Sequence, residues 1–104
     1  MIRPALHLLL HVLVPLAAAC WFYRPRWKSA WLSMLATMVI DLDHLLASPV
    51  YDPDRCGIGF HPLHAYPAIL VYAALFTIKK TRLVGLGLLI HMGLDITDCL
   101  FINR

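Results

Sequence analysis

The sequence has little charge for its length. Only 14% of its 104 residues are charged, none of them is Glu, and 61% are hydrophobic, whereas soluble domains average about 25% charged and about 45–50% apolar residues. A soluble domain of this size exposes a large share of its surface and needs polar side chains to cover it. This shortage argues against a soluble monomer, a disordered tail and a nucleic-acid-binding module.

Long stretches of the chain lack charge altogether. Residues 4–23 and 56–78 contain no Asp, Glu, Lys or Arg, and residues 29–40 and 83–94 are likewise uncharged. A helix of about 20 apolar residues crosses a hydrocarbon core about 30 Å thick. We therefore predict an all-α fold, an integral membrane four-helix bundle that forms a single transmembrane domain over residues 1–104. The predicted helices cover about residues 4–24, 27–47, 62–79 and 82–102.

The cations predict how this bundle is oriented. Residues 24–28 and 79–82, which connect the first two and the last two predicted helices, each hold three of the nine cations. Short loops rich in Lys and Arg face the cytoplasm. We therefore expect both termini and the loop of residues 48–61 on the outer side of the membrane.

The first twenty residues also resemble a secretory signal peptide. Their apolar run ends in Ala-Ala-Ala-Cys at residues 17–20, similar to a lipoprotein cleavage site. The run, however, contains His7, His11 and Pro15, and cleavage would place the cations of residues 24–28 outside. We therefore interpret this segment as the first membrane helix.

The ionisable side chains inside the predicted helices are His and Asp at helical spacing. Such groups are costly in a membrane, so each is expected to face the bundle interior and to have a partner. Side chains three or four residues apart share a helix face, and the predicted topology brings all four groups to a similar depth in the outer leaflet. The residues are His7 and His11; Asp41, Asp43 and His44; His61 and His64; and His91 and Asp95.

These nine side chains indicate a metal site. Neutral imidazoles and ionised carboxylates are the usual ligands of Zn²⁺, Mn²⁺ and Fe²⁺. Nine candidate donors exceed the four of one tetrahedral site, so we predict two divalent ions bridged by an Asp, zinc in the first place and manganese or iron as alternatives. Asp43 lies off the face shared by Asp41 and His44 in a regular helix. It is either a ligand at an unwound helix end or a carboxylate that orients an imidazole.

Three further residues leave alternatives open. Asp98 lies near the membrane interface and is either solvated or functional. Cys56 and Cys99 both map to the outer side, where a disulfide would persist and would tie the loop to the last helix. The sequence alone does not decide whether these two cysteines pair.

The motifs together resemble a known family. Asp-Leu-Asp-His at residues 41–44 closes the second predicted helix, and His-Met-Gly-Leu-Asp at residues 91–95 lies in the fourth. With the paired histidines before the third helix, they resemble the superfamily of small bacterial inner-membrane proteins known as membrane-bound metal-dependent hydrolases, including the LexA-regulated type, and within it a short four-helix branch. The chain departs from the larger family at residues 61–65, His-Pro-Leu-His-Ala, where that family tends to carry a wider His-Arg to His-Ser spacing. The resemblance implies metal-dependent hydrolysis in a bacterial inner membrane, with the site toward the periplasm.

The leading hypothesis is hydrolysis of an ester or phosphoester in a membrane lipid or lipid-like substrate by a metal-activated water. Asp43 is the predicted general base. Arg55, on the loop of residues 48–61, is predicted to hold a phosphate bidentately, or alternatively to pair with Asp52 or Asp54. No nucleic-acid partner is expected, and the sequence leaves open whether the chain forms a homodimer.

Other classes of protein would use the same side chains. A di-iron or haem oxidoreductase would use the histidines as iron ligands, although haem ligation has no use for the neighbouring carboxylates. A metal or proton transporter would need donors across the whole bilayer, and the cytoplasmic halves of the first and third predicted helices have none. A structural metalloprotein without catalysis would use the metal to hold a small fold together.

Overall fold

The chain folds into helices. The computed structural model describes residues 2–48 and 55–102, and these described residues contain four α-helices and no strand, which confirms the predicted all-α class. Three short 3₁₀ segments, labelled η, connect or extend the α-helices. The α-helices are α1 (Ile2–Phe22), α2 (Trp27–Ala36), α3 (Tyr66–Thr77) and α4 (Arg82–Ile102), and the 3₁₀ segments are η1 (Arg24–Arg26), η2 (Thr37–Leu46) and η3 (Pro62–His64).

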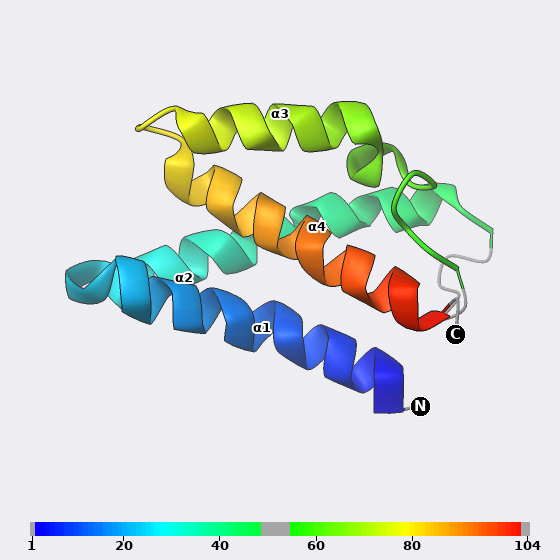
Figure 1. Cartoon of the computed structure of the whole chain (residues 1–104), viewed down its shortest axis with the longest axis horizontal. Coiled ribbons are helices and arrows are strands. Elements are labelled where there is room, and N and C mark those ends of the chain that lie inside the picture. Colours follow the sequence, from blue (N-terminus) through cyan, green and yellow to red (C-terminus); the bar gives the residue numbers. More distant parts are fainter. Residues whose placement is uncertain (1, 49–54, 103–104) are drawn as a thin grey trace.

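Helix α4 is the central element of the bundle. It packs against α1, α2 and α3, and Figure 1 shows it crossing between α3 and the α1–α2 pair. Gly85 and Gly87 allow two of these contacts, because a Cβ atom at Gly85 would collide with the backbone of Phe76 and one at Gly87 would lie 3.0 Å from Cα of Met34. The small residues of α4 thus permit close approach of neighbouring backbones.

The second predicted helix changes its winding at Thr37. Helix α2 ends at Ala36, and the chain continues as the 3₁₀ segment η2 to Leu46, whereas the sequence predicted one regular helix to residue 47. A 3₁₀ helix has three residues per turn, so side chains three apart are eclipsed. The buried side chains of η2 are Thr37, Ile40 and Asp43, a spacing of three that turns Asp43 into the bundle.

The third helix is shorter than predicted. In place of one helix over residues 62–79, the structure has η3 and then α3, with Ala65 in an extended conformation between them. Pro62 and Pro67 each stand in the first turn of their element, and a proline inside a continuous helix would lack a backbone hydrogen bond and clash with the carbonyl group four residues before it. The 12 residues of α3 span only about 18 Å.

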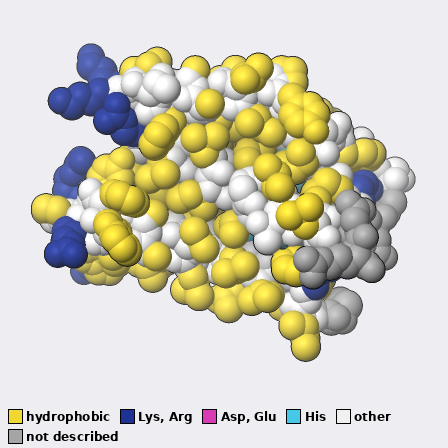
Figure 2. All heavy atoms as spheres, viewed as in Figure 1, with side chains coloured by type: hydrophobic (Ala, Val, Ile, Leu, Met, Phe, Trp, Pro, Cys, Tyr) yellow, Lys and Arg dark blue, Asp and Glu magenta, His cyan; other side chains and the backbone are white. Residues whose placement is uncertain are grey.

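The surface of the bundle is largely apolar. Three segments are long and apolar enough to cross a membrane, namely Ile2–Phe22, Arg24–Leu46 and Arg82–Ile102. Large apolar side chains such as Trp21, Leu46 and Leu70 are more than 70% exposed. Hydrophobic side chains cover most of the face of the molecule that Figure 2 shows. Lys and Arg gather at the end where α1 turns into α2 and α3 into α4. Exposed apolar area on this scale is typical of membrane-associated proteins.

Candidate metal centre

The nine predicted His and Asp side chains meet at one end of the bundle. It is the end that holds the start of α1, the end of η2, the segment before α3 and the C-terminal half of α4 (Figure 1). Within each of three groups, the candidate ligand atoms lie within 4.8 Å of one another. The four-donor group is Asp41, His64, His91 and Asp95; the α1 group is His7, His11 and Asp95; and the loop group is Asp43, His44 and His61.

Five of the six donor–donor distances in the four-donor group are close to those of a tetrahedron. Nε2 of His64 lies 3.2 Å from Asp41 Oδ1 and 3.0 Å from Asp95 Oδ2. Nε2 of His91 lies 3.1 Å from Asp41 Oδ1 and 3.2 Å from Asp95 Oδ2, and the two Nε2 atoms are 3.2 Å apart. A tetrahedral zinc ion with metal–donor distances of about 2.0–2.1 Å separates its donors by roughly 3.3–3.4 Å. The donors of this group therefore nearly match the edges of a zinc coordination sphere.

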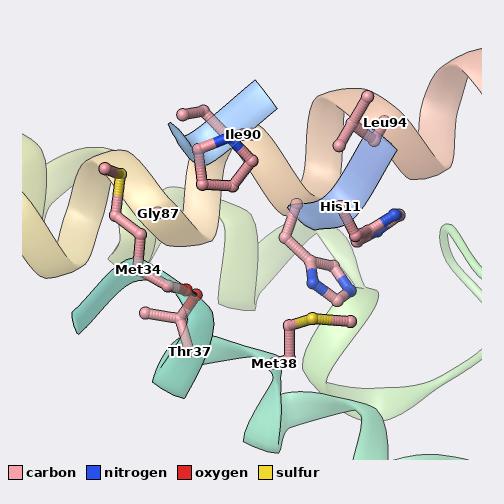
Figure 3. Close-up of a pocket in the computed structure, with 9 residues that line it drawn as sticks. His11, Met34, Thr37, Met38, Gly87, Ile90 and Leu94 are labelled. Atoms are coloured by element: carbon pink, nitrogen blue, oxygen red, sulfur yellow. Dashed lines mark hydrogen bonds between the residues drawn. The ribbon is translucent and has the colours of Figure 1, made fainter. Parts of the chain in front are cut away.

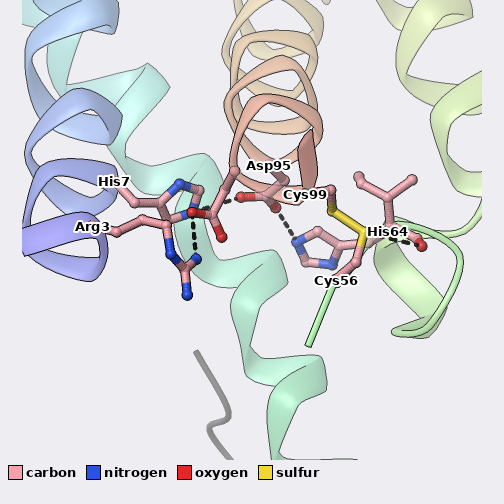
Figure 4. The surroundings of a disulfide bond; sticks show 8 residues. Arg3, His7, Cys56, His64, Asp95 and Cys99 are labelled. Carbon is pink, nitrogen blue, oxygen red and sulfur yellow. Dashed lines mark hydrogen bonds and ion pairs between the residues drawn. A yellow bond between two sulfur atoms is a disulfide. The ribbon is translucent and has the colours of Figure 1, made fainter. Parts of the chain in front are cut away.

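The α1 group shares one carboxylate with the four-donor group. Asp95 Oδ1 lies 2.9 Å from His7 Nε2 and 3.2 Å from His11 Nε2. Its other oxygen, Oδ2, faces His64 and His91, and Figure 4 shows the carboxylate between His7 and His64. Asp95 thus has the geometry of a carboxylate that bridges two ions.

Hydrogen bonds at the opposite ring nitrogen orient two of these imidazoles. Nδ1 of His11 donates to the carbonyl oxygen of His7 over 2.7 Å, and Nδ1 of His64 donates to Asp43 Oδ2 over 2.9 Å. A proton on Nδ1 leaves the Nε2 lone pair free for a metal. His91 differs, because its buried Nδ1 has no hydrogen-bond partner among the described residues.

Asp43 is buried and accepts hydrogen bonds on both oxygens. Oδ2 accepts from the backbone N–H of Leu63 over 2.9 Å as well as from His64, and Oδ1 accepts from Nδ1 of His44 over 3.2 Å. The sequence offered three roles for Asp43: a ligand at an unwound helix end, a carboxylate that orients an imidazole, and a general base. The contacts favour orientation of His64 over proton transfer, and they arise because η2 winds more tightly than a regular helix.

The histidines before α3 occupy different electrostatic surroundings. Burial and the neighbouring His44 lower the pKa of His61. Burial alone would also lower the pKa of His64, but hydrogen bonds to Asp41, Asp95 and Asp43 outweigh it and raise that pKa to about 10. His64 is therefore enclosed by carboxylates, which is the electrostatic environment that a cation prefers.

The two remaining charged residues that the sequence singled out belong to none of the three groups. Asp98, left open as solvated or functional, pairs with Arg3 at 2.8 Å, a partner that the sequence analysis missed although both residues belong to the outer ends of their predicted helices. The guanidinium carbon of Arg55 lies 4.8 Å from the ring centroid of Phe60. Asp52 and Asp54, the alternative partners of Arg55, lie outside the described residues.

A disulfide joins the loop to α4. Cys56 and Cys99 are bonded, with their Cα atoms 5.0 Å apart, and Figure 4 shows this bond beside His64. The sequence analysis also missed Tyr72, whose hydroxyl donates to the carbonyl oxygen of Leu63 over 2.7 Å. Both contacts fix the segment that carries His61 and His64.

On one side the site borders an apolar pocket. Figure 3 shows it between α1, α2 and α4, with His11 at its edge. Apolar walls lower the local dielectric constant and strengthen electrostatic interactions in the adjoining site. Its lining residues are His11, Pro15, Met34, Thr37, Met38, Gly87, Ile90, His91 and Leu94.

Comparison with known proteins gives the chain a family but no activity. No curated protein and no solved structure matches it. A family model described as a family of unknown function, DUF6122, matches residues 1–102. Its description carries no activity, so the resemblance to membrane-bound hydrolases stays a prediction. Because the match covers nearly the whole chain, the protein belongs to the DUF6122 family.

Proposed function

We propose that this protein is a membrane-embedded, metal-dependent hydrolase with two divalent ions, zinc in the first place, that cleaves an ester or phosphoester of a membrane lipid or lipid-like substrate. One observation carries the proposal. The two oxygens of Asp95 face two separate sets of imidazoles, His7 with His11 and His64 with His91. Two-metal hydrolytic sites hold their ions about 3.5–4 Å apart, a separation that a bridging carboxylate provides.

The two groups differ in how many donors they supply. The four-donor group offers the four donors that a tetrahedral site needs, whereas the α1 group has three donors and would leave a position for water or substrate, as catalytic zinc sites do. Bound metal would lower the pKa of a water and polarise the scissile group. The side chain of Asp41 is 39% exposed, so the site is open to solvent on that side.

The protein side chains would hold the reactants in position. In the hydrolysis, the water oxygen bonds to the carbonyl carbon or phosphorus, the ester bond breaks, and the leaving oxygen takes up a proton. Asp43 would keep His64 in its ligand orientation. Arg55 would bind a phosphate of the substrate with its guanidinium.

The surface supports a transmembrane arrangement. We infer that the end rich in Lys and Arg faces the cytoplasm and that the metal centre and both termini lie toward the periplasmic side of a bacterial inner membrane. The apolar sides of the bundle (Figure 2) would contact lipid. A site at the outer end of such a bundle would receive a lipid-like substrate from the adjoining leaflet.

Metal content and hydrolysis test this function together. The detergent-purified protein is analysed for bound metal and by ultraviolet–visible spectroscopy, then assayed on p-nitrophenyl ester and bis-p-nitrophenyl phosphate reporters and on a fluorogenic phospholipid. We expect at least two zinc or manganese ions per chain. His7→Ala and Asp95→Ala should bind fewer ions than the unmodified protein and should lose hydrolysis. Asp98→Asn, which removes a carboxylate outside the three groups, serves as the matched control and should retain both. Folded protein that binds no metal would refute the proposal, and a haem spectrum or stoichiometric iron would indicate an oxidoreductase instead.

The four-donor group also fits a second function. Its donors form a closed set, and closed sets are typical of structural zinc sites. A protein that binds metal, unfolds on chelation and hydrolyses none of the reporters would be a structural metalloprotein.

A further inference from the structure

We propose that the loop group, Asp43, His44 and His61, binds a third divalent metal ion. This inference rests on the proposed function, which uses the other donors for two ions. The α1 group and the four-donor group account for His7, His11, Asp41, His64, His91 and Asp95. Two imidazoles and one carboxylate oxygen then remain, and they too converge.

The three donors are close enough to share one ion. Their ligand atoms lie within 4.8 Å of one another. The rings of His44 and His61 stack with centroids 3.9 Å apart and an angle of 31° between their planes. Asp43 Oδ1 accepts a hydrogen bond from Nδ1 of His44 over 3.2 Å, and this contact holds the carboxylate beside the two rings.

Both imidazoles have a ring nitrogen available. Nδ1 of His44 donates to the carbonyl oxygen of Asp41 over 3.0 Å, which leaves its Nε2 lone pair free. His61 is 2% exposed, and no side-chain hydrogen bond joins its ring to another residue within 2–48 or 55–102. Neither ring nitrogen of His61 is therefore engaged by another described residue, and either one could bind a metal ion.

Asp43 connects this site to the four-donor group. Its Oδ2 accepts from His64 while its Oδ1 faces His44. Asp95 connects the α1 group and the four-donor group in a similar way, because one of its oxygens faces each group. Three ion positions would therefore follow one another along the end of the bundle, joined by Asp95 and by the Asp43–His64 contact.

The third ion would hold the loop against η2. His44 belongs to η2, whereas His61 lies in the segment before α3, where its backbone N–H donates to the carbonyl oxygen of Gly57 over 3.1 Å. Two imidazoles and one carboxylate suit zinc and related transition metals better than calcium or magnesium, which prefer oxygen donors. The ligand is therefore a zinc-class divalent cation.

Zinc stoichiometry tests the third site. The full-length protein is stripped with a chelator in detergent, dialysed against Zn²⁺ and counted by mass spectrometry of the metal. We expect three ions in the unmodified protein and two in both His61→Ala and His44→Ala. His7→Ala should also lose one ion, from the α1 group, and Asp98→Asn should keep all three. Circular dichroism checks that each variant folds. If His61→Ala does not fold, the zinc count of His44→Ala tests the site, because His44 is partly exposed.

The outcomes separate the third site from the proposed function. One outcome would overturn the third site and leave the two-ion hydrolase standing. In that outcome the unmodified protein and His61→Ala both bind two ions, and His7→Ala binds fewer. Three ions retained by both His61→Ala and His44→Ala would overturn it as well. Folded protein without bound zinc would overturn both proposals.

Discussion

Reduction of the Cys56–Cys99 disulfide should destabilise the protein measurably. The bond closes a loop with a sequence separation of 43 residues, which contains η3, α3 and most of α4. Loop-closure entropy for a loop of this length corresponds to about 4 kcal/mol at 25 °C. Helices that persist in the denatured state reduce this figure, so we expect a loss of about 2–4 kcal/mol in the free energy of unfolding.

The measurement compares four forms of the detergent-purified protein in chelator, so that bound metal adds no stability. Oxidised protein, reduced protein and the Cys56→Ala/Cys99→Ala double variant are unfolded by guanidinium or heat. Reductant should have no effect on the double variant. Cys20→Ala is the matched control, because Cys20 is exposed and free, and it should unfold like the oxidised protein.

Two results would refute the reasoning about the disulfide. Equal unfolding of the oxidised and reduced proteins would mean that the bond does not restrict the denatured chain. Alkylation of Cys56 and Cys99 before reduction, seen by intact mass, would mean that the bond is absent. If the bond constrains the site as well as the fold, the reduced protein should also bind Zn²⁺ more weakly, because His61 and His64 lie in the segment that the bond ties to α4.

Four substitutions test the packing and the metal centre. Gly85→Ala should lower stability in thermal unfolding by about 1–3 kcal/mol or more, because the new Cβ atom would meet the backbone of α3. Gly93→Ala should be neutral or slightly stabilising, because a Cβ atom there would have no atom of a neighbouring element within 4 Å. Equal stability of the two variants would contradict the close packing at Gly85. Asp43→Asn should weaken Zn²⁺ binding about 10–100-fold in chelator competition, because an amide has one accepting oxygen where the carboxylate has two, and unchanged affinity would show that Asp43 does not orient His64. Asp95→Asn should lower the bound zinc by more than one ion, since Asp95 belongs to two groups, and loss of a single ion by metal analysis would argue against a bridge.

The existence and type of the long helices could be predicted from the sequence because charge marks their ends. The predicted ranges 4–24 and 82–102 correspond to Ile2–Phe22 and Arg82–Ile102. Arg3 and Arg24 bound the uncharged run of the first helix, Arg82 begins the last one, and neither helix contains a proline that ends it.

The middle of the chain was harder to predict, because local backbone chemistry overrides the apolar pattern there. Pro67 divides the third predicted helix, which hydropathy alone indicated as continuous. The 3₁₀ winding of η2 leaves no mark in composition, yet it decides which side chains are buried. Asp43 faces the interior together with Thr37 and Ile40 only because the period there is three residues.

The candidate site could be predicted as a set of residues but not as a set of contacts. Helical spacing and topology together bring nine side chains to one depth. Which of them share an ion depends on side-chain directions, and two carboxylates illustrate this. Asp95 faces four imidazoles through two oxygens, and Asp43 accepts the Leu63 N–H, a contact that no spacing rule contains.

The geometry of the four-donor group supports the proposed cation over a network of hydrogen bonds alone. A hydrogen bond is directional, because its proton lies close to the line between two atoms. A single N–H on His64 Nε2 therefore points well at the oxygen of Asp41 or of Asp95. It does not point at the second oxygen or at His91 Nε2. The contacts of 3.0–3.2 Å among these atoms are nonetheless nearly equal. A cation at the centre of the group attracts all four donors at once, and an apolar pocket lined in part by His91 strengthens that attraction. Equal spacing of this kind therefore favours a metal ion, and stripping the metal should leave the end of the bundle that holds the metal centre less stable than the end that carries the cations, a difference that amide hydrogen exchange resolves.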